Sequence, residues 1–256
     1  MAELTASGQT PDVLFWVGCA GSFDDRAKRI TKAIARILHA SETSFAVLGQ
    51  EESCTGDPAK RAGNEFLYQM QAAQNIATLN GYEIKRIITG CPHCFNVLKN
   101  EYPELGGNYE VLHHTQFIRE LIETGKLRMA DGAPFRGKRI TFHDPCYLGR
   151  GNGEYLAPRE VIQKLDAELL EMRRCKQNAM CCGAGGAQMF KEAENGDSEV
   201  NHERTNEALE NKPEVIATGC PFCNTMITDG VKNANQESEV EVKDIAELIA
   251  EAADLL

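Results

Sequence analysis

Thr89-Gly90-Cys91-Pro92-His93-Cys94 returns later in the chain as Thr218-Gly219-Cys220-Pro221-Phe222-Cys223. Each copy follows an apolar run, Ile87-Ile88 in the first case and Val215-Ile216-Ala217 in the second. Short apolar runs of this kind are typical of buried strands, and proline is favoured in the first turn of a helix. Each copy therefore predicts a strand that ends just before a cysteine and a helix that begins just after it.

Nine of the ten cysteines form two sets of one pattern. The first set is Cys19, Cys54, Cys91 and Cys94, and the second is Cys146, Cys181, Cys182, Cys220 and Cys223. Apart from Cys182, each member of the second set lies 127 or 129 residues after its counterpart. Near-constant offsets indicate duplication, so we expect two tandem modules of one architecture. Cys175 stands outside the pattern, and we interpret it as a packed or free thiol.

Strand and helix patterns alternate along the first module. Apolar runs predict strands at residues 13–17, 45–48 and 84–89. Apolar residues at the helical period predict a helix around residues 30–38, and a longer helical stretch covers about residues 58–79. This alternation is typical of α/β proteins with parallel sheets. The predicted fold is therefore α/β, with two tandem repeated modules, each a small parallel sheet flanked by helices with cysteines at the carboxyl ends of the strands.

A segment rich in glycine and charge, residues 123–138, separates the two modules. We place the first cysteine-rich module at residues 10–125 and the second at residues 138–256. The second module is expected to begin with a strand at residues 139–143. An amphipathic helix at residues 242–252 is expected to close it.

The predicted topology brings the cysteines of each module together. Loops that leave the carboxyl ends of parallel strands share one edge of the sheet, the usual place for ligands in open α/β folds. Clustered thiolates bind soft metals, either zinc or iron with sulfide. Cys181-Cys182-Gly183-Ala184-Gly185-Gly186 adds a fifth thiol, one more than zinc needs, and glycines that let the backbone approach closely. For Cys91-Pro92-His93-Cys94 alone, thiol–disulfide exchange is an alternative.

Composition argues against several classes of partner. With 27 basic and 38 acidic residues, the net charge of −11 would repel a phosphate backbone, so no nucleic acid is expected. No apolar stretch approaches the roughly 20 residues that span a bilayer, so no direct membrane insertion is expected. The N-terminus also lacks the basic start and apolar stretch of a secretory signal. We therefore expect a cytoplasmic protein, whose cysteines are metal ligands or redox groups rather than disulfides.

The order of the cysteine motifs resembles a known family. A single cysteine, then Cys-Cys-Gly, then Cys-Pro-x-Cys, given twice, is similar to the cysteine-rich CCG family, which includes the heterodisulfide reductase B subunit and the iron-sulfur subunits of glycolate and lactate oxidation systems. The clearest matches are His143-Asp144-Pro145-Cys146, Cys181-Cys182-Gly183 and Gly219-Cys220-Pro221-Phe222-Cys223.

The resemblance implies an electron-transfer subunit of an oxidoreductase. Its second module would hold a 4Fe-4S-type iron-sulfur cluster, which is non-cubane in some members of the family. The residues that the resemblance implies as ligands are Cys146, Cys181, Cys182, Cys220 and Cys223.

The first module departs from the family pattern where Cys54-Thr55-Gly56 replaces Cys-Cys-Gly. Its four thiols, Cys19, Cys54, Cys91 and Cys94, could hold a conventional iron-sulfur cluster or a tetrahedral zinc ion. Paired five-thiol clusters, which in heterodisulfide reductases are thought to cleave a disulfide, are therefore not expected. Electron relay is the predicted function. Direct reduction of a disulfide or another small substrate is one alternative, and a zinc-binding interaction protein is another.

The resemblance also bears on partners. Fused members of the family carry ferredoxin-like cysteine runs ahead of these modules, and this sequence has none before Cys19. We therefore expect electrons to come from a separate ferredoxin-like iron-sulfur or flavin subunit, which could be membrane-bound.

Several polar residues near the motifs have more than one interpretation. His143 and the neighbouring Asp144 could hydrogen-bond near the cluster or form a structural turn. His93 is interpreted as non-essential, because the second copy of the motif has phenylalanine in its place. His113 and His114 follow a predicted strand and are interpreted as surface or interface residues.

Overall fold

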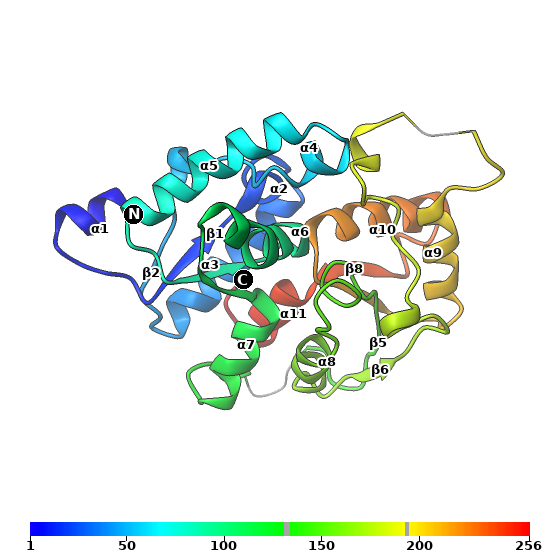
Figure 1. Cartoon of the computed structure of the whole chain (residues 1–256). Helices are drawn as coiled ribbons and strands as arrows, with labels where there is room; N and C mark the ends of the chain where they lie inside the picture. Colours follow the sequence, from blue (N-terminus) through cyan, green and yellow to red (C-terminus); the bar gives the residue numbers. More distant parts are fainter. Residues whose placement is uncertain (131–133, 193–194) are drawn as a thin grey trace.

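Two four-stranded parallel sheets organise the protein (Figure 1). The computed structural model describes residues 1–130, 134–192 and 195–256. The strand order is β2-β1-β3-β4 in the first sheet and β6-β5-β7-β8 in the second. The strands are β1 (Val13–Trp16), β2 (Phe45–Ala46), β3 (Arg86–Thr89), β4 (Glu110–His113), β5 (Arg139–Phe142), β6 (Glu168–Leu170), β7 (Val215–Thr218) and β8 (Glu241–Asp244). The predicted α/β fold with two repeated parallel sheets is confirmed.

Helices pack on both faces of the first sheet. Val13 and Phe15 of β1 join one hydrophobic cluster while Leu14 and Trp16 join another, because successive side chains of a strand point to opposite faces. All four are buried, as expected for a covered parallel sheet. The α-helices are α1 (Ala2–Ala6), α2 (Gly18–Phe23), α3 (Ala27–Ala40), α4 (Asp57–Arg61), α5 (Glu65–Gly81), α6 (Pro92–Asn96), α7 (His114–Glu123), α8 (Leu156–Gln163), α9 (Val200–Leu209), α10 (Pro221–Asn233) and α11 (Ile245–Ala252).

The helical stretch predicted at residues 58–79 is two helices, α4 and α5. Between them Gly63 has a φ of 88°, a left-handed conformation that ends α4. Asn64 then begins α5, because its side chain accepts a hydrogen bond from the Leu67 N–H at 3.1 Å. Asparagine at this position satisfies a free donor of the first turn.

The helix predicted at residues 242–252 begins three residues later in the structure, at Ile245. Residues 242–244 belong to β8, and α11 begins at Ile245. The cause is Asp244, whose carboxylate accepts from the Ala246 N–H while Glu247 reaches back to the Asp244 N–H. The observed strands are also shorter than those predicted at residues 13–17, 45–48, 84–89 and 139–143, as β1, β2, β3 and β5. Part of the predicted linker, residues 131–133, lies outside the described residues.

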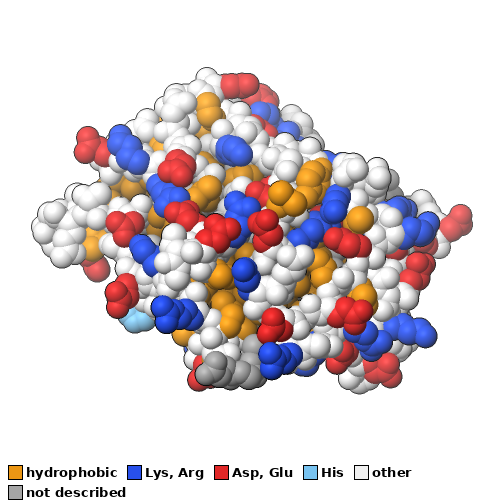
Figure 2. All heavy atoms as spheres, turned by 90° about the horizontal axis from the view of Figure 1, so that it is seen from below, with side chains coloured by type: hydrophobic (Ala, Val, Ile, Leu, Met, Phe, Trp, Pro, Cys, Tyr) orange, Lys and Arg blue, Asp and Glu red, His pale blue; other side chains and the backbone are white. Residues whose placement is uncertain are grey.

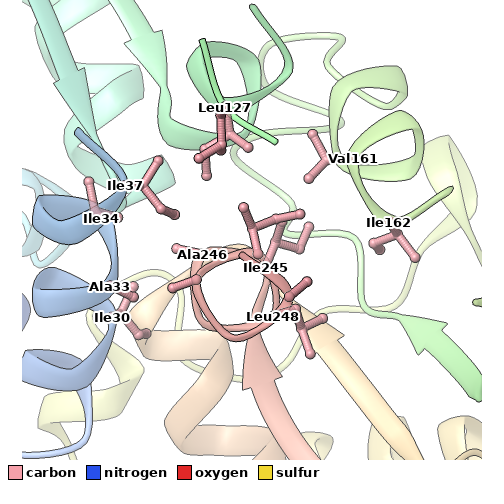
Figure 3. Close-up of a cluster of buried hydrophobic side chains, with 14 of the residues drawn as sticks. Ile30, Ala33, Ile34, Ile37, Leu127, Val161, Ile162, Ile245, Ala246 and Leu248 are labelled. Carbon is pink, nitrogen blue, oxygen red and sulfur yellow. The ribbon is translucent and has the colours of Figure 1, made fainter. Parts of the chain in front are cut away.

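The two modules share one hydrophobic core. In Figure 3, α11 of the second module lies between α3 of the first and the α8 residues Val161 and Ile162. Ile34 and Ile37 of α3 and Ile245 of α11 all belong to this buried cluster. The last helix of the first module, α7, contributes Phe117, Ile118 and Leu121 to the same core. The hydrophobic core therefore extends across the predicted module limits, 10–125 and 138–256.

Polar contacts also join the modules around this core. Arg26 makes two parallel hydrogen bonds to the Glu247 carboxylate, at 2.8 and 2.7 Å. His114 Nε2 lies 2.9 Å from an Asp244 carboxylate oxygen, and both side chains are almost fully buried. Bidentate arginine–carboxylate pairs fix orientation as well as adding energy. These contacts hold the two sheets in one relative position.

The surface mixes charges of both signs. On the face shown in Figure 2, acidic and basic side chains are interspersed with hydrophobic ones. Among the described residues, no helix has both the length and the apolar character that crossing a bilayer requires.

Ile245→Ala tests the shared core. The substitution should destabilise the chain by about 2–5 kcal/mol, the usual cost of deleting a buried isoleucine side chain. Trp16 is the only tryptophan and lies in the first sheet, so its fluorescence reports the first module during urea unfolding. We expect its midpoint to fall as far as the midpoint from circular dichroism. A Trp16 transition left unchanged by Ile245→Ala would show that the modules unfold independently.

Candidate metal centre

Four of the cysteines, Cys19, Cys91, Cys146 and Cys220, lie just beyond the carboxyl ends of strands, as the sequence predicts. Cys19 lies in α2 directly after β1, and Cys146 follows β5. Cys91 and Cys220 immediately precede α6 and α10, and a proline opens each helix. The N-terminal end of a helix carries partial positive charge, which favours anionic groups. This position therefore favours thiolates.

The five thiols of the second module form one hydrogen-bonded group. The bonded pairs are Cys146 with Cys181, Cys181 with Cys182, Cys182 with Cys223, and Cys223 with Cys220. Cys182, Cys220 and Cys223 are buried, whereas Cys146 and Cys181 are partly exposed. All five residues implied by the resemblance are thus brought together. Cys175 instead hydrogen-bonds Glu171, a carboxylate outside the group.

Crowding sets which thiol can ionise. Hydrogen bonds from Cys146, from Cys182 and from backbone N–H groups lower the pKa of Cys181 well below its usual range. The bond with Cys181 in turn raises the pKa of Cys182 to about 12, and the pKa of Cys146 rises for the same reason. A bound metal cation would overcome the raised pKa values of Cys146 and Cys182, because a coordinating thiol loses its proton outright. The donor set fits a cationic group held by several thiolates.

A glycine turn directs backbone donors at the sulfur in both modules. Gly183 has a φ of 94° and its N–H donates to Cys181 Sγ at 3.3 Å. Gly56 has a φ of 91° and its N–H donates to Cys54 Sγ at 3.5 Å. A Cβ on Gly56 would lie 2.7 Å from the Tyr68 ring. The left-handed turn and this close packing both explain why the motif ends in glycine.

The first module gathers its four thiols around a hydroxyl. Cys19 hydrogen-bonds Cys54 and lowers the pKa of Cys54 to about 7, and Cys91 hydrogen-bonds Cys94. Thr55 is 1% exposed, and its Oγ1 donates to Cys94 Sγ at 3.8 Å. The hydroxyl that replaces the family's second cysteine therefore contacts the thiol group directly.

The two thiol groups meet. Cys91 hydrogen-bonds Cys220, and this bond is the largest cause of the lowered pKa of Cys91. The neighbouring His93 packs edge-on against Phe222 with ring centroids 5.4 Å apart. His113 Nε2 lies 3.0 Å from the Gly219 carbonyl oxygen. Nine thiols thus form one continuous cluster. The sequence indicates an edge for each module, but nothing in it shows that the two edges face each other.

His143 lies against the thiols of the second module. One of its ring nitrogens and the sulfurs of Cys182 and Cys223 all lie within 4.8 Å of one another. Its Nδ1 is 2.9 Å from Arg204 Nε. Burial and the Arg204 charge lower the pKa of His143 to about 3, so the ring is neutral at physiological pH. Nothing in the sequence singles out Arg204, which lies 61 residues away.

Asp144 serves the structure rather than the thiols. Its two carboxylate oxygens each accept from Arg159 at 2.8 Å, and one also accepts from the Lys176 N–H at 2.8 Å. The structural interpretation of this residue is the one that the contacts favour.

The other histidines near the motifs are buried. His93 Nδ1 lies 2.8 Å from an Asp57 carboxylate oxygen. Burial lowers the pKa of His93, but Asp57 and the nearby thiols outweigh it, and the pKa is raised. His113 and His114 are 0% and 1% exposed, so they are interface residues and not surface ones.

Comparison with known proteins identifies the repeat. The cysteine-rich domain family CCG matches residues 13–99 and again residues 140–228. The EtfAB:quinone oxidoreductase of Syntrophomonas wolfei is 44% identical over 257 residues, which cover 98% of this chain and 36% of that protein. The probable iron-sulfur-binding oxidoreductase FadF of Bacillus subtilis is 43% identical over 251 residues, covering 98% of this chain and 35% of FadF.

A third relative comes from the heterodisulfide reductases. The D subunit of the dihydromethanophenazine:CoB–CoM heterodisulfide reductase of Methanosarcina barkeri is 34% identical over 253 residues, covering 95% of this chain and 59% of that protein. The chain spans about a third of the length of the first two relatives. With the family matching both modules, the predicted resemblance is confirmed: the chain belongs to the cysteine-rich CCG family, whose named relatives here are iron-sulfur and heterodisulfide oxidoreductases.

Proposed function

We propose that the chain relays electrons, as an iron-sulfur component of a larger oxidoreductase. In the second module, Cys146, Cys181, Cys182, Cys220 and Cys223 would hold a 4Fe-4S-type cluster, cubane or non-cubane. Such a cluster supplies one-electron chemistry at a potential set by its surroundings. The observation that carries the proposal is the hydrogen bond between Cys91 and Cys220. A redox centre in each thiol group would be close enough for electrons to pass from one module to the other.

The first module would hold a second metal group through Cys19, Cys54, Cys91 and Cys94. An iron-sulfur cluster is the occupant that makes a relay, whereas zinc has no redox chemistry. Thiol–thiol hydrogen bonds lower the pKa of Cys54 and Cys91 and raise the pKa of Cys19 and Cys94. One thiol of each pair is therefore favoured as the thiolate, which is the metal-binding form.

Donor and acceptor would be groups outside this chain. We propose that a ferredoxin-like iron-sulfur or flavin centre supplies the electrons, on a separate subunit or on another domain. The relative named EtfAB:quinone oxidoreductase makes a quinone the acceptor to test first. Keeping ten cysteines unpaired suits the reducing cytoplasm.

A second candidate function is direct reduction of a small disulfide. A groove of ≈ 280 Å³ lies beside Cys19 and is lined by side chains of both modules, including Phe23, Phe190 and Phe222. Phe23 is 82% exposed and Phe190 is 63% exposed. An apolar opening at the thiols could admit a substrate, which a pure relay does not require.

Metal analysis after anaerobic purification tests the proposed function. We expect iron and acid-labile sulfide bound to the chain, with visible absorption that is lost on treatment with an iron chelator. A colourless protein that binds zinc alone would rule out the relay and favour the zinc-binding interaction protein.

Cys182→Ser and Cys175→Ser form a matched pair. Cys182 lies within the thiol group, whereas Cys175 bonds Glu171 outside it. We expect Cys182→Ser to alter or abolish the paramagnetic resonance signal of the second-module cluster and Cys175→Ser to leave it unchanged. Equal effects of the two substitutions would refute the ligand assignment.

Thr55→Cys restores the family pattern in the first module. Because Thr55 Oγ1 already contacts Cys94, the new thiol should reach the metal group and shift its resonance signal, while the second-module signal stays the same. Thr55→Ser is the control, since it keeps the hydroxyl. An unchanged first-module signal in Thr55→Cys would mean that the metal lies away from this side chain.

Oxidation by small disulfides separates the two candidate functions. The reduced protein is mixed with disulfides in the absence of any partner. The relay predicts only slow oxidation, and Thr225→Trp, which fills the groove, should not change its rate. Rapid oxidation that Thr225→Trp blocks would instead support the reductase.

A further inference from the structure

His143 carries a buried nitrogen without a partner. The side chain is 1% exposed, and its Nε2 has no hydrogen-bond partner among the described residues. Buried polar atoms are nearly always hydrogen-bonded, because leaving one unpaired is costly. A specific unpaired atom beside a thiol group therefore indicates a partner that binds there.

Arg204 decides which ring nitrogen of His143 carries the hydrogen. A guanidinium group only donates hydrogen bonds, so His143 Nδ1, 2.9 Å from Arg204 Nε, must accept. A neutral imidazole has one N–H, and here it is on Nε2. Arg204 is itself fixed, because Nη1 donates to the Arg174 carbonyl oxygen at 2.9 Å and lies 3.3 Å from Glu207 Oε2.

Two sulfurs of the second module lie close to the His143 ring. One ring nitrogen of His143 lies within 4.8 Å of the Cys182 and Cys223 sulfurs, and Nδ1 is already engaged by Arg204. We propose that His143 is a positioning residue of the second metal group, donating from Nε2–H to sulfur there, and that it is not a metal ligand. The role rests on the proposed iron-sulfur function.

The first module has a ring donor at the equivalent place. Trp16 is paired with Thr89 of β3, and His143 follows Phe142, which is paired with Ala217 of β7, one residue before Thr218. Trp16 is fully buried, packs in the same hydrophobic cluster as Cys91 and Cys94, and its Nε1–H has no partner among the described residues. Indole can only donate. Each module thus carries, at or just after the end of its first strand, a buried ring nitrogen with no partner among the described residues.

A donor at this position has a definite electronic effect. Hydrogen bonds to the sulfurs help to set the reduction potential of an iron-sulfur cluster. Because the reduced state carries one more negative charge, a donated hydrogen bond stabilises it and raises the potential. The side chain of His143 would thereby tune the group without binding it.

Nuclear magnetic resonance of the metal-free protein tests the tautomer. With ¹⁵N-labelled histidine, correlation of the ring nitrogens with the ring carbon-bound hydrogens distinguishes a protonated nitrogen from an unprotonated one. We expect His143 to carry hydrogen on Nε2 alone. Hydrogen on Nδ1 would overturn the proposal, whether or not the protein binds iron.

Redox titration of the reconstituted protein tests the donor role. His143→Leu should shift the midpoint potential of the second-module cluster downward, and His143→Gln, whose amide can donate, should recover part of the shift. His202→Gln, a change on α9 at a partly exposed histidine, should leave the potential unchanged. An unshifted potential in His143→Leu with the cluster intact would overturn the donor role and leave the relay standing. A chain that binds neither iron nor sulfide would overturn both.

Discussion

The hydrogen bond between Cys91 and Cys220 joins the two halves of the thiol cluster. Cys91 follows the inner strand β3 and Cys220 follows the inner strand β7. Each residue immediately precedes a helix. When the two edges meet, thiols of both modules become buried together. Buried thiols resist losing several protons at once, because the thiolates would be desolvated and would repel one another. A metal cation would offset that negative charge.

The shared core is what keeps the edges in contact. Helix α11 packs on α3 of the other module (Figure 3), and Arg26 clamps Glu247 across the same boundary. If the modules were independently mobile, the Cys91–Cys220 contact would open and close. A single shared core instead fixes the spacing of the two thiol groups. The duplicated sequence is therefore used as one structure, in which each module supplies half of the site.

The sequence predicted what depends on local pattern. The twofold Cys-Pro-x-Cys motif, the parallel sheets and the meeting of thiols within each module follow from period and spacing. The predicted start of the last helix, residue 242, was wrong. The amphipathic pattern continues into β8, but the cap formed by Asp244 and Glu247 begins α11 at Ile245. The contacts between modules, and the pairing of His143 with Arg204, could not be predicted. These contacts depend on how elements far apart in the chain pack together. No local sequence pattern indicates that packing.

The central claim is that the thiols hold iron, with a metal group in each module and the two groups adjoining at Cys91 and Cys220. Anomalous X-ray scattering across the iron and zinc absorption edges, from crystals grown anaerobically, locates each metal directly. We predict iron at the second-module thiols and a second metal beside Cys94 and Thr55, with the Cys91–Cys220 pair between them. Absence of iron at Cys182 and Cys223, or zinc alone throughout the cluster, would contradict the account.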